Sequence, residues 1–313
     1  MHETNGSQPR IATSFPPEVG KLAVVTTSTS GIGYEIALAL ARAGADVIVT
    51  GKHSQEGHEA LARIRPLAPD VLVRFEKLDL ESLASVREFA RRLGAAGRPI
   101  DLLINNACTL MLSQRELTVD GFERHLGMNF LGHFALTANL LGLLRAARQA
   151  RVVSLTSTGR HHGQIEFDDL HLASGYTPLK AYSQSKLATM IFAVELQRRS
   201  EARGWGLAGN SAQPIGTKAA QIANATEVTG SMSWYRRTLG FSPEQLRGGV
   251  LQALLEAPAD RGAQDSATAV KGLVDLIGPA VPEAVDMRVL DPVTGRRLWE
   301  AATALTGTTW PEN

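Results

Sequence analysis

Tyr182 and Lys186 are the residues whose types and spacing point most directly to chemistry, since a phenol and an ammonium lie four positions apart in an apolar, helix-like run. Four residues are slightly more than one helical turn, so both side chains leave the same face and can act on one ligand. A nearby cation would lower the tyrosine pKa from about 10 towards general acid/base range. Taken alone, the spacing also fits ordinary helix packing.

The composition excludes several classes of function. A net charge of +1 over 313 residues offers no electrostatic footprint for nucleic acid. Cys108 is the only cysteine, which rules out an intrachain disulfide framework and thiolate metal sites and fits a reducing compartment. The remaining candidates, His53 with His58 and His161 with His162, lack zinc-site spacing, so we expect no metal.

Residues 1–20 carry Gly6, Pro9, Pro16 and Pro17 among polar residues and lack the apolar core of a signal peptide. We therefore expect a flexible N-terminal leader. No segment approaches the roughly 18 uninterrupted apolar residues that a membrane helix requires, which predicts no membrane span. Together with the single cysteine, these features predict a cytoplasmic protein.

The elements that must position the pair begin with a strand at 22–26, a glycine turn, a helix over 34–43 closed by Gly44, and a strand at 47–50. This is a βαβ unit, which implies a parallel sheet. Similar alternation continues through five further elements and the helix that carries Tyr182. Their expected ranges are strands 71–78, 101–104 and 151–155, helices over 83–93 and 122–148, and a helix ending near Arg199. We predict α/β architecture, a doubly wound Rossmann-type parallel sheet flanked by helices, in a single domain over 21–313.

The C-terminal third is harder to interpret. The run after Gly206 is rich in small residues and makes a poor strand. Residues 214–262 break the alternation, so they form either a substrate loop or lid, or a simple cap on the sheet. Residues 287–290 are expected to form a closing strand, followed by a helix around 297–305.

The turn before the first helix has a physical reason to bind a dinucleotide. Its small residues, Ser28, Ser30, Gly31 and Gly33, let backbone N–H groups approach a pyrophosphate at the positive end of the helix. A tight turn without a ligand is the alternative. The position of the turn, after the first strand and before a helix, favours the nucleotide.

Six segments together resemble the short-chain dehydrogenase/reductase superfamily in order and spacing, over roughly residues 20–215. They are Thr26 to Gly33, Leu78-Asp79-Leu80, Asn105-Asn106-Ala107, Met128 to Phe134, Thr156-Ser157, and Tyr182 with Lys186. Residues 118–123, 132–134 and 151–170 further resemble the retinol dehydrogenase and WW-domain oxidoreductase branch.

The resemblance implies a role for each of four residues. Tyr182 would exchange a proton with the substrate oxygen, and Lys186 would lower the phenol pKa and hold the nicotinamide ribose. Ser157 would hydrogen-bond the reacting oxygen, although a strand-end cap is the structural alternative. Asn129 would hold a water that links Lys186 to solvent, or else be a buried amide satisfied by backbone. Donors aimed at one point would stabilise the developing alkoxide.

Cofactor choice follows from the end of the second strand, where NAD-preferring relatives carry an acidic residue. Here Lys52 follows Gly51 and no carboxylate occurs before Glu56, so we predict NADP(H), with NAD(H) possible. The alternative is that Lys52 is only a solvated surface charge. Asp79 would contact the adenine or cap the next helix. The other expected cofactor contacts are Thr27, Ser28, Ser30, Gly31, Ile32, Gly33, Leu80, Asn106, Ala107, Pro214 and Thr217.

Three family glycines are replaced here, by Thr27, Cys108 and Ile215. A β-branched residue at Thr27 reduces backbone freedom, so the adenosine end would bind differently or more weakly. We interpret Cys108 as a small buried hydrophobe beside the nicotinamide. Ile215 affects how the loop after Pro214 covers the nicotinamide amide, a role otherwise expected of Thr217.

The sequence therefore predicts an NADP(H)-dependent oxidoreductase that transfers hydride between nicotinamide and a small-molecule alcohol or carbonyl substrate, mainly apolar. The alternative is a catalytically impaired nucleotide-binding or interaction protein on the same fold. The long helices at 122–148 and 180–199 resemble those that pair between subunits in this superfamily, which predicts a homodimer or homotetramer. Their apolar residues could instead pack entirely on the sheet.

Overall fold

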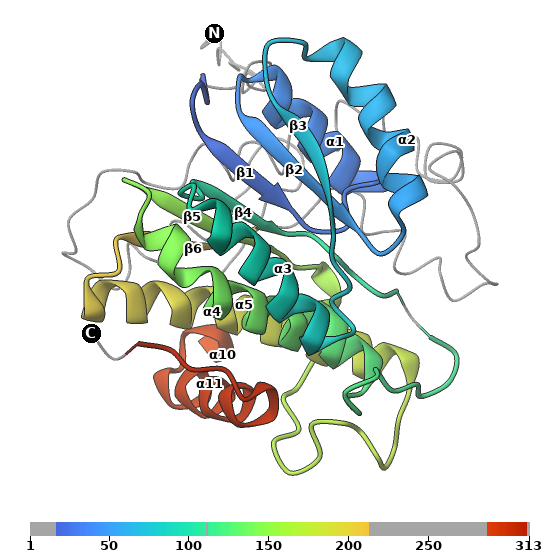
Figure 1. Cartoon of the computed structure of the whole chain (residues 1–313). Helices are drawn as coiled ribbons and strands as arrows, with labels where there is room; N and C mark the ends of the chain where they lie inside the picture. The colour runs from blue at the N-terminus through green and yellow to red at the C-terminus, as the bar shows by residue number, and fades with distance from the viewer. Residues whose placement is uncertain (1–16, 111, 213–286, 312–313) are drawn as a thin grey trace, which may run out of the picture.

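A computed structural model of the chain describes residues 17–110, 112–212 and 287–311 (Figure 1). Six parallel strands form one sheet in the order β3-β2-β1-β4-β5-β6. The strands are β1 (Leu22–Val25), β2 (Asp46–Gly51), β3 (Val73–Lys77), β4 (Leu102–Asn105), β5 (Ala150–Leu155) and β6 (Leu207–Ala212). This topology confirms the predicted doubly wound parallel sheet. Its order reverses between β1 and β4, and in doubly wound sheets ligands bind at this point, outside the carboxyl ends of the strands.

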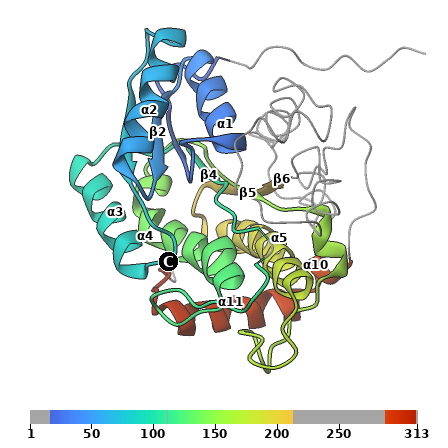
Figure 2. The same cartoon turned by 90° about the vertical axis from the view of Figure 1, so that its right-hand side faces the viewer.

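Helices cover both faces of the sheet and create two separate cores (Figure 2). On one face pack α1 (Gly31–Arg42) and α2 (Ser54–Ile64), which is followed by the 3₁₀ turn η1 (Arg65–Leu67). On the other face pack α3 (Leu83–Ala96), α4 (Gly132–Arg145) and α5 (Pro178–Arg203). The strands are buried on both faces, as their continuous apolar runs require.

The predicted long helix at 122–148 is shorter and contains a change of helical type. It begins at Arg124 and passes through the π-helical segment η2 (Leu126–Leu131) before α4, which ends at Arg145. Within the described chain, Leu126–Arg145 also meets the length and hydropathy test for a membrane span, but 72% of that window is buried. Such burial is typical of a core helix.

The weak strand expected after Gly206 is present as β6, and its small residues have a packing reason. A Cβ atom at Gly209 would lie 2.6 Å from the carbonyl oxygen of Ala193 on α5. The small side chains therefore let α5 approach β6 closely. This places the helix that carries Tyr182 directly on the edge strand.

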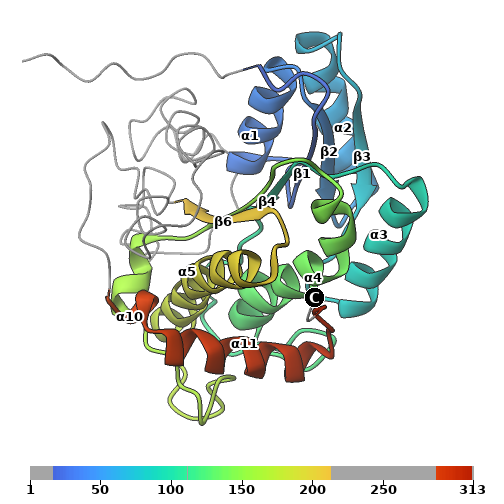
Figure 3. The same cartoon turned by 90° about the vertical axis from the view of Figure 1, so that its left-hand side faces the viewer.

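The closing strand expected at 287–290 is wrong, because this segment is the short helix α10 (Met287–Leu290). Arg288 donates to the carbonyl oxygens of Gly163 and His161, outside the sheet. The predicted C-terminal helix is present as α11 (Pro292–Thr306), capped by Asp291. Figure 3 shows α11 lying along α5.

The last residues of the leader that we placed at 1–20 pack against the domain. Glu18 is 3% exposed and pairs with Lys21 at 2.6 Å and with Arg151 of β5 at 3.0 Å. Residues 1–16 and the whole of the expected substrate loop, 214–262, lie outside the described residues. The predicted domain boundaries stay predictions.

Candidate active site

Ser157 and Tyr182 approach each other across Gly159. Ser157 directly follows the buried strand β5 and caps the 3₁₀ turn η3 (Thr158–His162), where its hydroxyl accepts from the Gly159 N–H at 3.2 Å. A Cβ atom at Gly159 would lie 3.0 Å from Tyr182 Cε1 and 3.6 Å from Ser157 Oγ. Ser157 is therefore a cap at the end of the strand and also lies beside Tyr182. The absence of a side chain at Gly159 leaves space between the two residues.

Lys186 lies one turn beyond Tyr182 on α5, as the four-residue spacing predicts. Its Nζ is 5.9 Å from the centre of the Tyr182 ring and donates to the Leu155 carbonyl oxygen at 3.0 Å. Only 3% of Lys186 and 5% of Tyr182 are exposed. The structure thus brings Ser157, Tyr182 and Lys186 together at the carboxyl end of β5.

Asn129 lies in the π-helical segment η2 and connects two elements. Its Oδ1 accepts from the Thr109 N–H at 2.7 Å, and its Nδ2 donates to Ser185 Oγ on α5 at 2.9 Å. π-helical turns occur frequently at functional sites because they offset one residue from the helical register. The side chain of Asn129 holds the loop after β4 against α5, whereas its water link to Lys186 stays a prediction.

The glycine turn after β1 is built for close approach to a ligand. Gly31 has a φ of +60°, and a Cβ atom at Gly33 would lie 2.4 Å from the Thr27 carbonyl oxygen. Ser30 is the N-cap of α1, and its side chain makes no capping bond. The first turn of α1 contains no acidic residue, so its N–H groups and its dipole suit an anionic group. These features fit a pyrophosphate, with Ile32 in the same turn.

Thr27 occupies a left-handed backbone conformation, with a φ of +47°. Its N–H donates to Thr50 Oγ1 at 3.1 Å, and its carbonyl oxygen accepts from Asn106 Nδ2 at 3.0 Å. Left-handed φ values are strained for β-branched residues. The sequence signal for this strain was the glycine missing from the family pattern.

Ser28 and Thr50 lock the turn to β2. Ser28 Oγ donates to the Val25 carbonyl oxygen at 2.7 Å and accepts from the Thr50 N–H at 2.9 Å. Both side chains are fully buried. Ser28 is thus a structural support of the turn, whereas Thr27 and Ser30 beside it are exposed, and the predicted cofactor contacts of all three stay predictions.

Lys52 contributes to a cavity of about 560 Å³ at the carboxyl end of β2. His53, Glu56 and Lys77 also line it, so the cavity carries both signs of charge. Lys52 Nζ lies 3.0 Å from Asp79 Oδ2, and the hydrogen bond that Lys52 donates to Asp79 raises the pKa of Lys52. The cavity lies where the adenosine end of a dinucleotide would be expected.

Asp79 does not cap the next helix, since the cap of α3 is Ser82, which accepts from the Ser85 N–H. Asp79 instead accepts from the Glu81 N–H and faces Lys52. Leu80 is buried, and its carbonyl oxygen would lie 2.5 Å from a Cβ atom at Gly132.

Asn106 and Ala107 directly follow β4, and both bond to Thr26, to which the sequence analysis gave no role. Their N–H groups donate to Thr26 Oγ1 at 2.8 and 2.9 Å, and Thr26 Oγ1 contacts His133 Nε2 at 2.9 Å. His133 Nδ1 contacts the Asn129 carbonyl oxygen at 3.0 Å, which fixes Nδ1 as the protonated nitrogen. Burial, outweighing that bond, lowers the pKa of His133 to about 4.

This hydrogen-bond chain joins the end of β1, the loop after β4 and the π-helical segment, so it couples the cofactor side to Asn129. Its signal in the sequence was the Gly132-His133-Phe134 motif, whose histidine received no function. Cys108 is partly buried and contacts the Thr109 carbonyl oxygen at 3.4 Å. Pro214, Ile215 and Thr217 lie outside the described residues.

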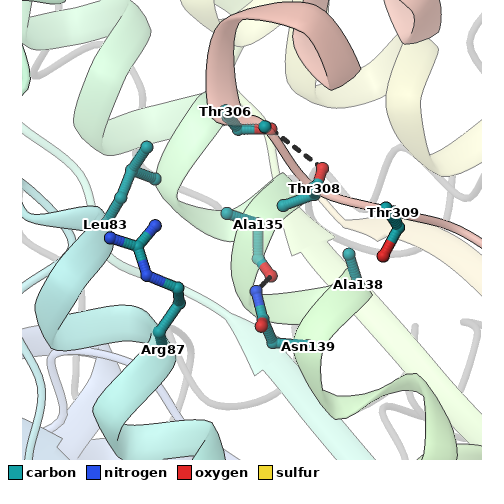
Figure 4. A pocket seen from close by; sticks show the side chains of 9 residues that line it. Leu83, Arg87, Ala135, Ala138, Asn139, Thr306, Thr308 and Thr309 are labelled. Carbon is teal, nitrogen blue, oxygen red and sulfur yellow. Dashed lines mark hydrogen bonds between the residues drawn. The ribbon is translucent and has the colours of Figure 1, made fainter.

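A smaller cavity of about 170 Å³ lies between α3, α4 and the end of α11 (Figure 4). Arg87, Asn139 and Thr308 line it, and Asn139 Nδ2 donates to the Ala135 carbonyl oxygen at 2.7 Å. None of the predicted site residues borders this cavity. In the part of the chain that the structure describes, no cluster of three His, Cys, Asp or Glu side chains is suited to a metal ion.

The sequence is similar to one family model and to several known proteins. The chain matches the short chain dehydrogenase family model over residues 21–228. It is 48% identical to polyprenol dehydrogenase from Mus musculus over 204 residues, which are 64% of this chain and 61% of that protein. It is 36% identical to retinol dehydrogenase 13 from Homo sapiens over 317 residues, covering 97% of this chain and 88% of that protein. The match thus spans less than two thirds of the polyprenol dehydrogenase.

Solved structures show the same similarity. An uncharacterised protein from Mycobacterium paratuberculosis has a TM-score of 0.76 at 31% identity and covers 97% of this chain and 100% of its own. The RhlG/NADP active-site complex from Pseudomonas aeruginosa has a TM-score of 0.52 at 26% identity, over 67% of this chain and 78% of its own.

Proposed function

The chain belongs to the short chain dehydrogenase family and is an oxidoreductase of that family; on this premise we propose that it is an NADP(H)-dependent alcohol dehydrogenase or carbonyl reductase with Tyr182 as its general acid/base. The observation that carries the proposal is the convergence of Ser157 and Tyr182 on the space beside Gly159, with Lys186 one turn away.

The geometry supports a separate role for each of Ser157, Tyr182 and Lys186. When bound, the nicotinamide accepts a hydride from the alcohol carbon or donates one to the carbonyl carbon. Tyr182 takes the hydroxyl proton in the first direction and gives it back in the second, at the substrate oxygen. Ser157 donates a hydrogen bond to that oxygen, and the Lys186 ammonium stabilises the phenolate. The burial of all three excludes bulk water, which strengthens these interactions.

The preference for NADP(H) is supported by Lys52 and by the absence of an acidic residue among the first four positions after β2. The Lys52 side chain is 51% exposed, so it can turn from Asp79 to a 2′-phosphate with little change in burial. The NADP complex of the related RhlG structure agrees with this choice.

Fluorescence titration of NADPH and NADH tests the cofactor preference. We expect Lys52→Asp to weaken NADPH binding about tenfold or more, because it replaces a charge-assisted bond by like-charge repulsion. NADH lacks the 2′-phosphate and is the internal control, whose affinity should change far less. Tighter binding of NADH than of NADPH by the unaltered protein would overturn the preference.

The substrate class that we propose is an isoprenoid alcohol or the corresponding carbonyl. The names of two relatives, a polyprenol dehydrogenase and a retinol dehydrogenase, support this class, because both name long apolar isoprenoid alcohols. A panel that pairs isoprenoid alcohols with small polar alcohols and ketones tests it. Turnover restricted to the small polar compounds would contradict the proposal.

Replacement of Tyr182 by Phe tests the mechanism. We expect cofactor-dependent turnover to be abolished, with folding and NADPH binding largely intact, because only the hydroxyl is removed. Lys186→Met should also abolish turnover, whereas Lys180→Met is the matched control, since Lys180 lies on the same helix, pairs with Glu166 and is 40% exposed. Turnover by Tyr182→Phe comparable to that of the unaltered protein would refute the mechanism. NADPH binding by the unaltered protein without any turnover across the panel would favour the alternative, a nucleotide-binding or interaction protein.

We also propose a cytoplasmic location. The single cysteine, Cys108, supports a reducing compartment.

A further inference from the structure

Glu123 and His125 form a buried pair immediately before the π-helical segment. Neither side chain is exposed to solvent. Glu123 Oε1 accepts from the His125 N–H at 3.0 Å and contacts His125 Nδ1 at 2.7 Å, while Oε2 accepts from the Leu126 N–H at 2.8 Å. Burial by itself raises the pKa of Glu123, but the hydrogen bonds from His125 and Leu126 outweigh it and lower that pKa. The carboxylate is therefore fully engaged.

Both ring nitrogens of His125 have fixed partners. Nε2 accepts from the Leu112 N–H at 3.3 Å, so the ring proton lies on Nδ1 and is donated to Glu123. With both nitrogens occupied, His125 has no free site for a proton from substrate. Any effect of this ring on the reaction must come from the groups that it holds in place.

His125 holds the loop that follows β4 beside the reacting phenol. Its ring contacts the Tyr182 ring edge-on, with 6.3 Å between ring centres and an angle of 80°. Leu112 is held at its N–H by His125 and at its carbonyl oxygen by the Tyr176 hydroxyl, 3.1 Å away. Asn129, four residues after His125, holds Thr109 in the same loop. Two polar side chains of one helix thus attach this loop next to Tyr182.

We propose that Glu123 and His125 are positioning residues for the reaction: Glu123 fixes the His125 ring against Tyr182, and the His125 Nε2 bond to Leu112 holds the loop after β4 at that ring. This inference rests on the proposed function of Tyr182 for its kinetic consequence alone. The structural consequence, a Leu112 amide protected by His125, does not depend on any activity.

Two amide substitutions separate the two bonds of His125. In His125→Asn, the short side chain places its amide near the former Nδ1, so it can still donate to Glu123 but cannot reach Leu112. In His125→Gln, the longer side chain carries an amide oxygen to the former Nε2 position, where it can accept from the Leu112 N–H. Both variants lose the ring contact with Tyr182, so they are matched in that respect.

The matched structural control is His171→Asn. His171 accepts from the Glu123 N–H and stacks on Phe122 in the same cluster, with 5.8 Å between ring centres. The contact of His171 with the loop after β4 is made by its carbonyl oxygen, which accepts from Arg115 and is kept in the variant. A purely structural role of the cluster would affect His171→Asn and His125→Asn alike.

Kinetics with the best substrate of the panel give the first readout. We expect kcat to fall about 10- to 100-fold in His125→Asn, because a displacement of about 1 Å at a reacting group has this effect. His125→Gln should stay within about threefold of the unaltered protein for the same reason, since it retains the Leu112 bond. The Kd for NADPH should not change, as the cofactor turn is held by Thr50 and Asn106.

Hydrogen exchange at the Leu112 amide gives the second readout, which needs no turnover. We expect exchange to accelerate at least tenfold in His125→Asn and to stay slow in His125→Gln and His171→Asn. Equal exchange or equal kcat in the two His125 variants would overturn the inference, as would an equal loss of kcat in His171→Asn. An absence of turnover in the unaltered protein would instead count against the proposed function, with the exchange result still deciding the role of His125.

Discussion

Replacement of Thr27 by glycine tests whether the cofactor turn is strained. Thr27 has a φ of +47° and an exposed side chain, and its backbone N–H and carbonyl oxygen bond to Thr50 and Asn106. Glycine keeps both backbone bonds and removes only the Cβ atom and its branches. The change therefore isolates the conformational energy of one residue.

The expected gain follows from two opposing terms. A left-handed conformation costs an L-residue about 1–2 kcal/mol, and a β-branched residue lies at the upper end. Glycine loses more backbone freedom on folding, at a cost of about 0.5–1 kcal/mol. The net expectation is a stabilisation of about 1 kcal/mol, which raises the Tm of a chain of this size by about 2 °C.

Thermal and urea unfolding of a small series measure this gain. Thr27→Asn should be intermediate, because asparagine tolerates left-handed φ, and Thr27→Ala should gain least, because it keeps a Cβ atom. Thr29→Gly is the matched control: Thr29 is 6% exposed and is not among the positive-φ residues, so the same substitution there should destabilise the protein. A Thr27→Gly variant no more stable than Thr27→Ala would refute the reasoning. A lower Kd for NADPH in Thr27→Gly would further show that the Thr27 side chain opposes the cofactor.

Two other predictions concern His133 and the C-terminal helix. Burial lowers the pKa of His133 from 6.5 to about 4, so the unfolded chain binds a proton at this residue before the folded protein does. The protein should therefore lose up to about 3 kcal/mol of stability as the pH falls from about 6.5 to about 4. Urea midpoints should fall less steeply over that range in His133→Gln, and identical slopes would contradict the assignment. Trp299 of α11 packs on Phe134 of α4 and Phe192 of α5, with ring centres 5.0 and 5.9 Å apart, and so covers apolar surface of the long helices that we expected to pair between subunits. We expect light scattering to give a dimer or tetramer mass, and the monomer mass of 33.5 kDa would instead show that the apolar residues of these helices pack entirely within one subunit.

The candidate site was predictable from short-range geometry for Tyr182 and Lys186, and from the resemblance to the short-chain dehydrogenase/reductase superfamily for the roles of Ser157 and Asn129. The spacing of Tyr182 and Lys186 fixes their shared face once the helix forms. Ser157 follows a strand whose apolar residues require burial, and parallel strands present their carboxyl ends at one edge. The glycines of the first turn likewise carry their own conformational signal. These residues needed no knowledge of distant contacts.

The errors fall where local patterns are ambiguous. Four residues at 287–290 suit a strand or a helical turn equally well, and the bonds of Arg288 to Gly163 and His161, more than 120 positions away, hold them outside the sheet. The small residues of β6 made a poor strand in isolation. They favour a strand here only because α5 packs closely against Gly209, where a larger residue would not fit.

The sequence by itself determined the order of most elements, the glycine turn after β1 and the shared helix face of Tyr182 and Lys186, because periodicity and spacing act within a few residues. Only the tertiary structure decided the roles of Glu123, His125 and His133. Their functions depend on burial and on partners such as Thr26, Leu112 and Tyr182, which are far away in the chain. The sequence does not show which ring nitrogen of a histidine carries the proton, because the hydrogen-bond partners in the folded protein determine the tautomer.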